Sequence, residues 1–60
     1  TDREREILTK LAGGQSVREI AQELFISDQT VSAHKRNMMR KFDVHSSREL
    51  VEKSRKHKLL

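Results

Sequence analysis

Apolar residues recur at helical spacing in four segments of the chain, which are joined by short polar breaks. In residues 17–24 the apolar positions are i, i+3, i+4 and i+7, so they share one face of an α-helix. Similar patterns cover residues 2–12, 28–42 and 47–57, and no segment alternates in the manner of a β-strand. The predicted inward positions are Ile7, Leu8, Leu11, Val17, Ile20, Ala21, Leu24, Val31, Met38, Phe42, Leu50 and Val51, with Ser54 at the margin.

Signals for helix starts and ends agree with these segments. Gly13 and Gly14 follow the first segment, at the point where a helix C-terminus favours a residue that can adopt a positive φ. Three segments begin with the pattern of a capping box, in which a hydroxyl and a carboxylate satisfy free helical amides reciprocally. These predicted boxes are Thr1 with Glu4, Ser16 with Glu19, and Ser46 with Glu49.

The third segment also starts after a serine, Ser27, but it carries Thr30 where the other segments have an acid. A carboxylate at that position would repel a phosphate near the helix N-terminus, whereas a threonine can donate a hydrogen bond to one. Thr30 is also acceptable there for structural reasons alone, and Asp28 in the same turn opposes an anion. The missing acid is therefore a weak indication of a phosphate site.

Residues 16–42 predict a short helix, a very short break and a second helix rich in basic residues. This helix-turn-helix arrangement is the usual means of placing side chains in a DNA groove. We therefore expect an all-α fold, a four-helix bundle-like domain with a central helix-turn-helix. Its expected function is sequence-specific binding of double-stranded DNA, with the helix of residues 28–42 in the major groove.

Charge is distributed unevenly along the 60 residues, which are enough for one small domain. Residues 1–30 hold four basic and six acidic side chains, a net charge of −2, whereas residues 31–60 hold nine and three, a net charge of +6. A basic half beside an acidic half suits a polyanionic partner, although a solvated lysine-rich surface would have the same composition.

Composition and spacing argue against several classes of protein. No apolar run approaches the roughly 20 residues that span a bilayer, and the absence of cysteine excludes disulfides and thiolate metal sites and agrees with a cytoplasmic location. His34, His45 and His57 lack metal-ligand spacing, and no glycine-rich phosphate loop or nucleophile–base pair is visible. We therefore expect no metal, no cofactor, no membrane association and no enzymatic activity.

The inward positions of residues 28–42 place Ser32, Ala33 and Arg36 outward, as candidate contacts to DNA bases. An arginine can pair bidentately with guanine O6 and N7, so Arg36 is the strongest candidate, with a phosphate contact as its alternative. Ala33 is small enough to meet a thymine methyl, or it serves only as a good helix former. Ser32 suits either a base edge or a phosphate.

Candidate phosphate contacts surround the same helix, because donors at its N-terminus and along its rim can reach the DNA backbone. Each of them could instead be a solvated polar residue. His34 is expected to be packed, with a hydrogen bond to backbone or phosphate. The candidates are Ser16, Arg18, Ser27, Gln29, Thr30, Lys35, Arg40 and Lys41.

Sequence elements from Thr1 to about Val51 resemble the LuxR/NarL/GerE-type helix-turn-helix domain of bacterial transcription regulators. The matching elements are TDREREIL, AGGQS, REIAQEL, IS, TVSAH, N, KF, V and SR. The resemblance implies four helices, base reading at the positions of Ser32, Ala33 and Arg36, and dimeric DNA binding through the fourth helix. It also implies that residues 1–60 are the C-terminal output domain of a longer regulator, for example a response regulator.

Two residues depart from the pattern that the resemblance implies. Phe25 occupies the turn, where many simple helix-turn-helix proteins have glycine, so we expect a turn without a positive-φ residue. Ser32 stands where the family often has lysine or arginine, which weakens its expected role in base reading.

The fourth segment is expected to mediate a weak homodimer on DNA through a shallow surface that includes Val51 and Ser54. The alternative is that it only completes the core. Two other functions remain open beside DNA regulation. One is a protein-interaction module, which would contact RNA polymerase or a partner domain, and the other is a promoter-binding region of the sigma-factor type.

Overall fold

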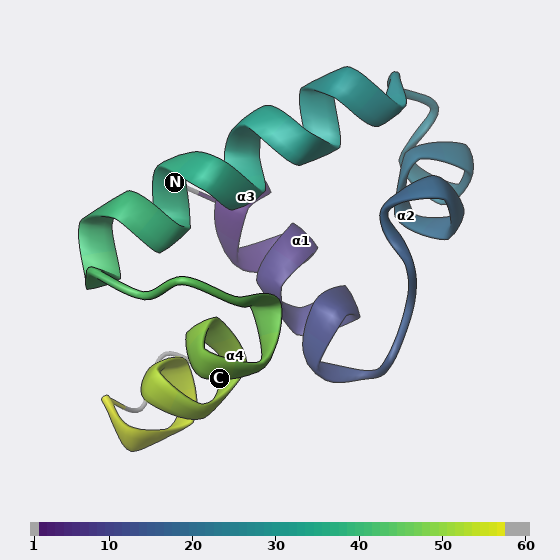
Figure 1. Ribbon diagram of the computed structural model, residues 1–60. Helices are drawn as coiled ribbons and strands as arrows, with labels where there is room; N and C mark the ends of the chain where they lie inside the picture. Colours follow the sequence, from purple (N-terminus) through teal and green to yellow (C-terminus); the bar gives the residue numbers. More distant parts are fainter. Residues whose placement is uncertain (1, 58–60) are drawn as a thin grey trace.

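The longest helix lies along one side of the molecule and packs against the three others (Figure 1). The computed structural model describes residues 2–57, which form α1 (Asp2–Ala12), α2 (Val17–Leu24), α3 (Asp28–Phe42) and α4 (Ser47–Lys56). α3 packs against α1, α2 and α4, whereas α2 and α4 have no packing contact with each other. The predicted all-α four-helix fold is confirmed, and only α4 departs from its predicted bounds, by ending one residue earlier.

One completely buried apolar side chain from each helix meets in a single core: Ile7, Ile20, Val31 and Leu50 all have an exposed fraction of zero. Every position that the periodicity placed inward is buried or partly buried. The core also includes Val44, which the sequence did not predict because it lies in the connection between α3 and α4, outside any helical repeat.

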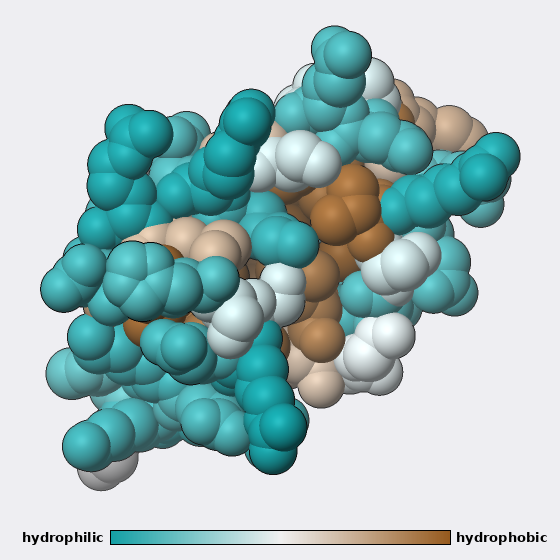
Figure 2. Space-filling model, viewed as in Figure 1, coloured by the Kyte–Doolittle hydropathy of each residue, from teal (hydrophilic) through white to brown (hydrophobic). Residues whose placement is uncertain are grey.

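Part of this core reaches the surface between the helices. Figure 2 shows hydrophobic residues in the middle of the view, bordered by hydrophilic side chains. Among residues 2–57, Phe25 is the one large hydrophobic side chain that is exposed, at 94%. No helix in the same range is long and apolar enough to cross a membrane.

Ser54 lies on the inward face of α4 and is completely buried. Its hydroxyl donates a hydrogen bond of 2.7 Å to the carbonyl oxygen of Leu50, one turn earlier. A buried hydroxyl is tolerated when it has such a partner, so α4 can pack a serine in the core. The marginal inward placement of Ser54 is confirmed, but its assignment to a dimer surface is wrong, because a second chain cannot reach a side chain without exposed area.

Three helices end at a residue in the left-handed region, with φ of 92° at Gly14, 58° at Phe25 and 54° at Asp43. In each case the amide of the following residue donates to a carbonyl five residues earlier, as in a Schellman motif. These hydrogen bonds satisfy carbonyl groups that would otherwise lack a partner at the helix ends. They join Gln15 to Lys10 at 3.1 Å, Ile26 to Ala21 at 3.0 Å and Val44 to Met39 at 3.0 Å.

Phe25 contradicts the expectation of a turn without a positive φ, since its φ and ψ are 58° and 41°. The left-handed conformation costs a residue with a side chain about 1–2 kcal/mol, and the exposed ring recovers none of this through burial. The turn must change the direction of the chain within the three residues between α2 and α3. The left-handed residue returns Ile26 to the core in that short distance, and this packing outweighs the strain.

The predicted capping boxes have different outcomes. Ser16 forms a complete box with Glu19: its hydroxyl accepts the Glu19 amide at 3.2 Å, and its own amide donates to the Glu19 carboxylate at 3.0 Å. Ser46 forms only half of one, because its hydroxyl accepts the Glu49 amide at 3.1 Å while the Glu49 carboxylate does not bond back. Thr1, in the remaining predicted box, lies outside the described residues.

α4 is attached to the C-terminal end of α3 by polar and aromatic contacts. Lys53 Nζ donates a 2.6 Å hydrogen bond to the carbonyl oxygen of Phe42, the last residue of α3. A cation is favourable there because helix C-termini carry partial negative charge. The Phe42 ring also stacks on His57, with 6.4 Å between the ring centroids. These contacts hold α4 in place without help from α2.

Replacing Val31 with aspartate should unfold the domain. An unpaired carboxylate in an apolar core costs several kcal/mol, which approaches the whole stability of a 60-residue domain, about 3–9 kcal/mol. Ala33→Asp is the matched control, because Ala33 is partly exposed and the carboxylate of the introduced aspartate can stay in water. Far-ultraviolet circular dichroism should show lost helicity only for Val31→Asp. A folded Val31→Asp chain would mean that the rotational phase of α3 is wrong.

Replacing Phe25 with glycine should stabilise the fold by about 0.5–1 kcal/mol. Relief of the left-handed strain exceeds the entropy that a glycine adds to the unfolded chain. Phe25→Ala removes the exposed ring but keeps a Cβ at the strained position, so its unfolding midpoint should stay close to that of the native chain. Thermal unfolding compares the two variants, and equal shifts would show that backbone strain is not the cause.

Candidate nucleic-acid interface

α2 and α3 form a helix-turn-helix with only residues 25–27 between them. Figure 1 shows α2 beside the N-terminal end of α3 and α4 below its C-terminal end, with α1 between them on the same side. Because these helices cover the side of α3 that carries Val31 and Met38, the opposite side of α3 faces solvent.

The predicted base contacts lie on or beside this solvent-facing side. Arg36 is exposed, and Ser32 and Ala33 are partly exposed. Helical spacing aligns Ala33 and Arg36 with Gln29 and Arg40 in one stripe along α3, with Ser32 at its margin. Within residues 2–57 the Arg36 guanidinium has no hydrogen-bond or ion-pair partner, so all its donors remain available to a ligand.

Two hydroxyl groups meet at the N-terminus of α3. Ser27 Oγ accepts the amide of Thr30 at 3.1 Å, and the hydroxyl oxygens of the two residues are 2.8 Å apart. This pair occupies the place where Ser16 has a carboxylate partner in α2. The two hydroxyls share one hydrogen bond, which leaves one O–H to donate outward. The start of α3 therefore presents a neutral donor to an anion.

The other predicted phosphate contacts lie within the stripe or beside it, on α2 and α3. Arg18 at the start of α2 is exposed, as are Gln29 and Arg40 on α3, whereas Lys35 is partly exposed. Ser16 is exposed at the N-terminus of α2, although its hydroxyl already accepts the amide of the capping box. Donors thus lie at the beginning of both helices and along α3.

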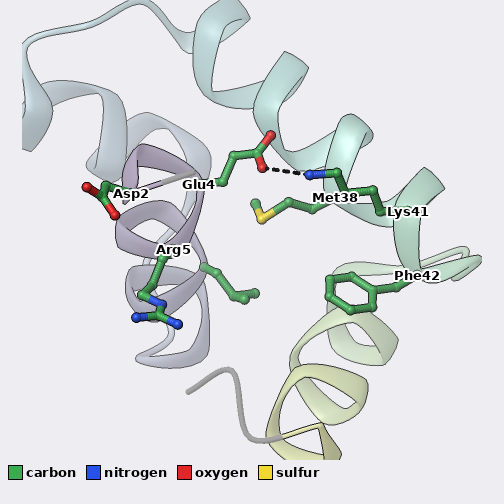
Figure 3. A pocket seen from close by; sticks show the side chains of 7 residues that line it. Asp2, Glu4, Arg5, Met38, Lys41 and Phe42 are labelled. Atoms are coloured by element: carbon green, nitrogen blue, oxygen red, sulfur yellow. Dashed lines mark hydrogen bonds and ion pairs between the residues drawn. The ribbon is translucent and has the colours of Figure 1, made fainter.

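Lys41 reaches from the end of α3 to Glu4 on α1 (Figure 3). Its Nζ lies 3.4 Å from Glu4 Oε1, and the lysine side chain is 66% exposed while that of Glu4 is only 14% exposed. Burial raises the pKa of the Glu4 carboxyl, but opposing influences, led by the hydrogen bond and charge of Lys41, lower it below its usual 4.5. The predicted phosphate contact therefore has an acidic partner within the domain.

The same two residues line an open groove of about 340 Å³ between α1 and α3. Apolar side chains and charged groups from both helices border it, namely Asp2, Arg5, Leu8, Met38 and Phe42. Residues 2–57 contain no cluster of three or more side chains suited to holding a metal ion. The feature of the groove that bears on the interface is the negative charge of Glu4, which lies next to α3.

His34 also faces Glu4, with 3.9 Å between its Nδ1 and Glu4 Oε2. The histidine side chain is 28% exposed, but its Nδ1 atom is buried and has no hydrogen-bond partner within residues 2–57. The expected packing of His34 is confirmed. The expected hydrogen bond to the backbone is not made by Nδ1.

A second polar cluster fixes α2 to the end of α1. Glu23 on α2 accepts hydrogen bonds from Lys10 Nζ at 2.5 Å and from Gln15 Nε2 at 2.7 Å. The bond from Lys10, followed by that from Gln15, holds the pKa of the Glu23 carboxyl below its usual range. The cluster orients the first helix of the helix-turn-helix relative to the core.

Sequence reasoning missed two side chains that make contacts at the end of α3. Glu4 was assigned only to a cap, because its contact with Lys41 joins positions 37 residues apart and no local pattern marks it. The one available indication was chemical: the first helix contains an acidic residue, and the basic third helix was expected to pack near it. Lys53 was missed for a different reason. Its acceptor is a backbone carbonyl oxygen, which no pattern of side chains marks.

Comparison with known proteins shows which family the chain resembles. The family model GerE, described as bacterial regulatory proteins of the luxR family, matches residues 1–54. Fimbriae Z protein of Salmonella typhimurium is 43% identical over all 60 residues, and the chain spans 29% of that protein. The oxygen regulatory protein NreC of Staphylococcus haemolyticus is 50% identical over 58 residues, which are 97% of this chain and 27% of that protein.

A solved structure has nearly the same fold. The response regulator ChrA of a heme-sensing two-component system superimposes with a TM-score of 0.97 at 35% identity, covering 100% of this chain and 30% of that one. The chain thus spans less than a third of each of these proteins. With its helix-turn-helix, its exposed basic stripe and this match over most of its length, the chain belongs to the luxR family of bacterial regulatory proteins and is a DNA-binding domain for transcription regulation.

Proposed function

We propose that α3 lies in the major groove of double-stranded DNA and reads bases with Ser32, Ala33 and Arg36. The observation that carries the proposal is the stripe on α3, where an arginine without a partner among residues 2–57 stands opposite the buried side of the helix. A bidentate arginine–guanine pair contributes about 1–3 kcal/mol of discrimination between bases. Ala33 leaves room for the groove wall, and Ser32 contacts the edge of the site.

Phosphate contacts then fall on donors at the two ends of this stripe and around it. The hydroxyl pair at the start of α3 and the exposed residues at the start of α2 face the backbone on one side, and the cations later in α3 face it on the other. The full set proposed is Ser16, Arg18, Ser27, Gln29, Thr30, Lys35, Arg40 and Lys41. Such contacts set position and affinity but carry no sequence information.

For the whole protein, we propose that residues 1–60 are the C-terminal output domain of a longer cytoplasmic regulator. The response regulator ChrA, of which this chain spans 30%, supports that arrangement. The proposed activity is binding rather than catalysis. A contact with RNA polymerase is a second candidate, favoured by Phe25, whose exposed ring lies at the turn rather than on the α3 stripe.

Arg36→Ala and Lys41→Ala should separate base reading from phosphate binding. Arg36→Ala should lower the preference for a selected sequence by about 5- to 150-fold, the equivalent of about 1–3 kcal/mol, with a smaller loss on random DNA. Lys41→Ala should weaken binding to all sequences alike and reduce the slope of log affinity against log salt by about one. Duplexes selected from a randomised pool, measured at several salt concentrations, test both. An unchanged preference in Arg36→Ala would contradict the base contact.

We further propose that α4 forms a weak symmetric dimer surface when two chains bind adjacent half-sites. Val51 is partly exposed and lines a shallow groove with Leu11 of α1. Polar and charged side chains border the groove, namely Ser47, Arg48, Glu52 and Arg55. Two apolar side chains provide far less than the roughly 1,200 Å² that a specific interface buries, so DNA must hold the chains together.

Val51→Glu should abolish cooperative binding to an inverted repeat while leaving binding to one half-site intact. The chain should be monomeric at low micromolar concentration without DNA. Lys56→Gln makes the same change of charge on an exposed part of α4 outside the groove, so its cooperativity should persist. Electrophoretic mobility shifts and sedimentation measure these properties. Unchanged cooperativity in Val51→Glu would mean that α4 only completes the core.

A further inference from the structure

Lys41 is the one proposed phosphate contact whose charge is paired with an acid among residues 2–57. Its Nζ lies 3.4 Å from Glu4 Oε1. Figure 3 shows the two side chains extending toward each other from α3 and α1, across the groove that Met38 also lines. A DNA phosphate that binds this amine must therefore take it from a carboxylate of the same domain.

The two members of the ion pair differ in their freedom to move. The Lys41 side chain is 66% exposed, and its flexible four-carbon stem lets the amine turn toward a phosphate. The Glu4 side chain is only 14% exposed and lies beside Leu8 and Met38 at the groove. On contact with DNA the amine would leave and the carboxylate would stay next to α3.

Glu4 keeps other partners when Lys41 turns away. Its second oxygen lies 3.9 Å from His34 Nδ1, and Glu4 has a further interaction besides those with Lys41 and His34. Losing Lys41 therefore costs only the attraction between the two charges. An ion pair with an exposed partner changes an equilibrium constant by up to about fivefold, so a phosphate can displace the carboxylate, but the exchange lowers the affinity for DNA.

We propose that Glu4 competes with DNA phosphate for Lys41 and thereby lowers the affinity of the domain for all duplexes alike. Phosphate contacts carry no sequence information, so the competition leaves the preference between sequences unchanged. Glu4 is thus a residue that tunes affinity through Lys41 and does not itself contact DNA. This inference rests on the proposed phosphate contact of Lys41.

Glu4→Gln tests the competition, because the amide keeps the size of the side chain and removes its charge. Fluorescence anisotropy of the 60-residue chain with two labelled duplexes, one selected from a randomised pool and one of mixed sequence, gives the affinities. Low ionic strength is needed, since salt screens exposed charges. Affinity for both duplexes should rise by about two- to fivefold. A merely structural role of Glu4 would give the opposite sign, because damage to the fold weakens binding.

Glu6→Gln is the matched control. It removes the same charge from the same helix, but Glu6 pairs with Arg3 of α1, at 2.9 Å, and not with a residue of α3. Its effect on DNA affinity should be smaller than that of Glu4→Gln.

Two further variants tie the gain to the ion pair. Glu4→Gln combined with Lys41→Ala should bind no more tightly than Lys41→Ala alone. Glu4→Asp keeps the charge but shortens the side chain by a methylene, so the carboxylate retracts from Lys41 and part of the gain should remain. Circular dichroism monitors folding, and Glu4→Asp decides the question if the amide variant does not fold.

The outcomes separate this inference from the proposed function. Unchanged or weaker binding by folded Glu4→Gln, a gain on the selected duplex alone, or a gain that persists without Lys41 would overturn the inference while leaving DNA binding intact. Native affinity in Lys41→Ala would remove both the phosphate contact and the competition. A native chain that binds neither duplex would instead refute the proposed function.

Discussion

Burial of one side of α3 is the constraint on which the rest of the structure depends. Val31 has no exposed surface and Met38 almost none, and together they fix how the helix is rotated against α1, α2 and α4. Once that rotation is set, Ala33 and Arg36 can only point outward. Buried apolar residues thus decide which side chains of α3 face solvent.

The order and bounds of the helices could be predicted because caps and periodicity are local properties. Ser16 and Gly14 mark ends through interactions that reach only a few residues along the chain. The left-handed conformation of Phe25 could not be predicted, since it follows from the need to return Ile26 to the core across a very short turn. The burial of Ser54 also depends on three-dimensional packing, which periodicity described only as a margin.

For the candidate site, too, the sequence predicted local properties but not contacts between distant residues. Helical phase identified Arg36 as outward, and the structure agrees with that orientation. Its contacts with DNA remain proposals, because they need a partner that the chain does not contain. The pairing of Glu4 with Lys41 was out of reach, because it joins the first helix to the end of the third. Acids and bases in sequence reveal net charge, but they do not reveal which carboxylate a given lysine meets.

The meeting of one fully buried residue from each helix makes the four helices depend on one another. Because α1 and α3 each pack against every other helix, loss of any helix uncovers part of their core surface, so the solvent-facing side of α3 is intact only in chains that are folded throughout. DNA that binds this state and not the unfolded one must then stabilise it by mass action. In a domain this small, a destabilising substitution far from α3 would lower operator occupancy simply by reducing the population of folded molecules.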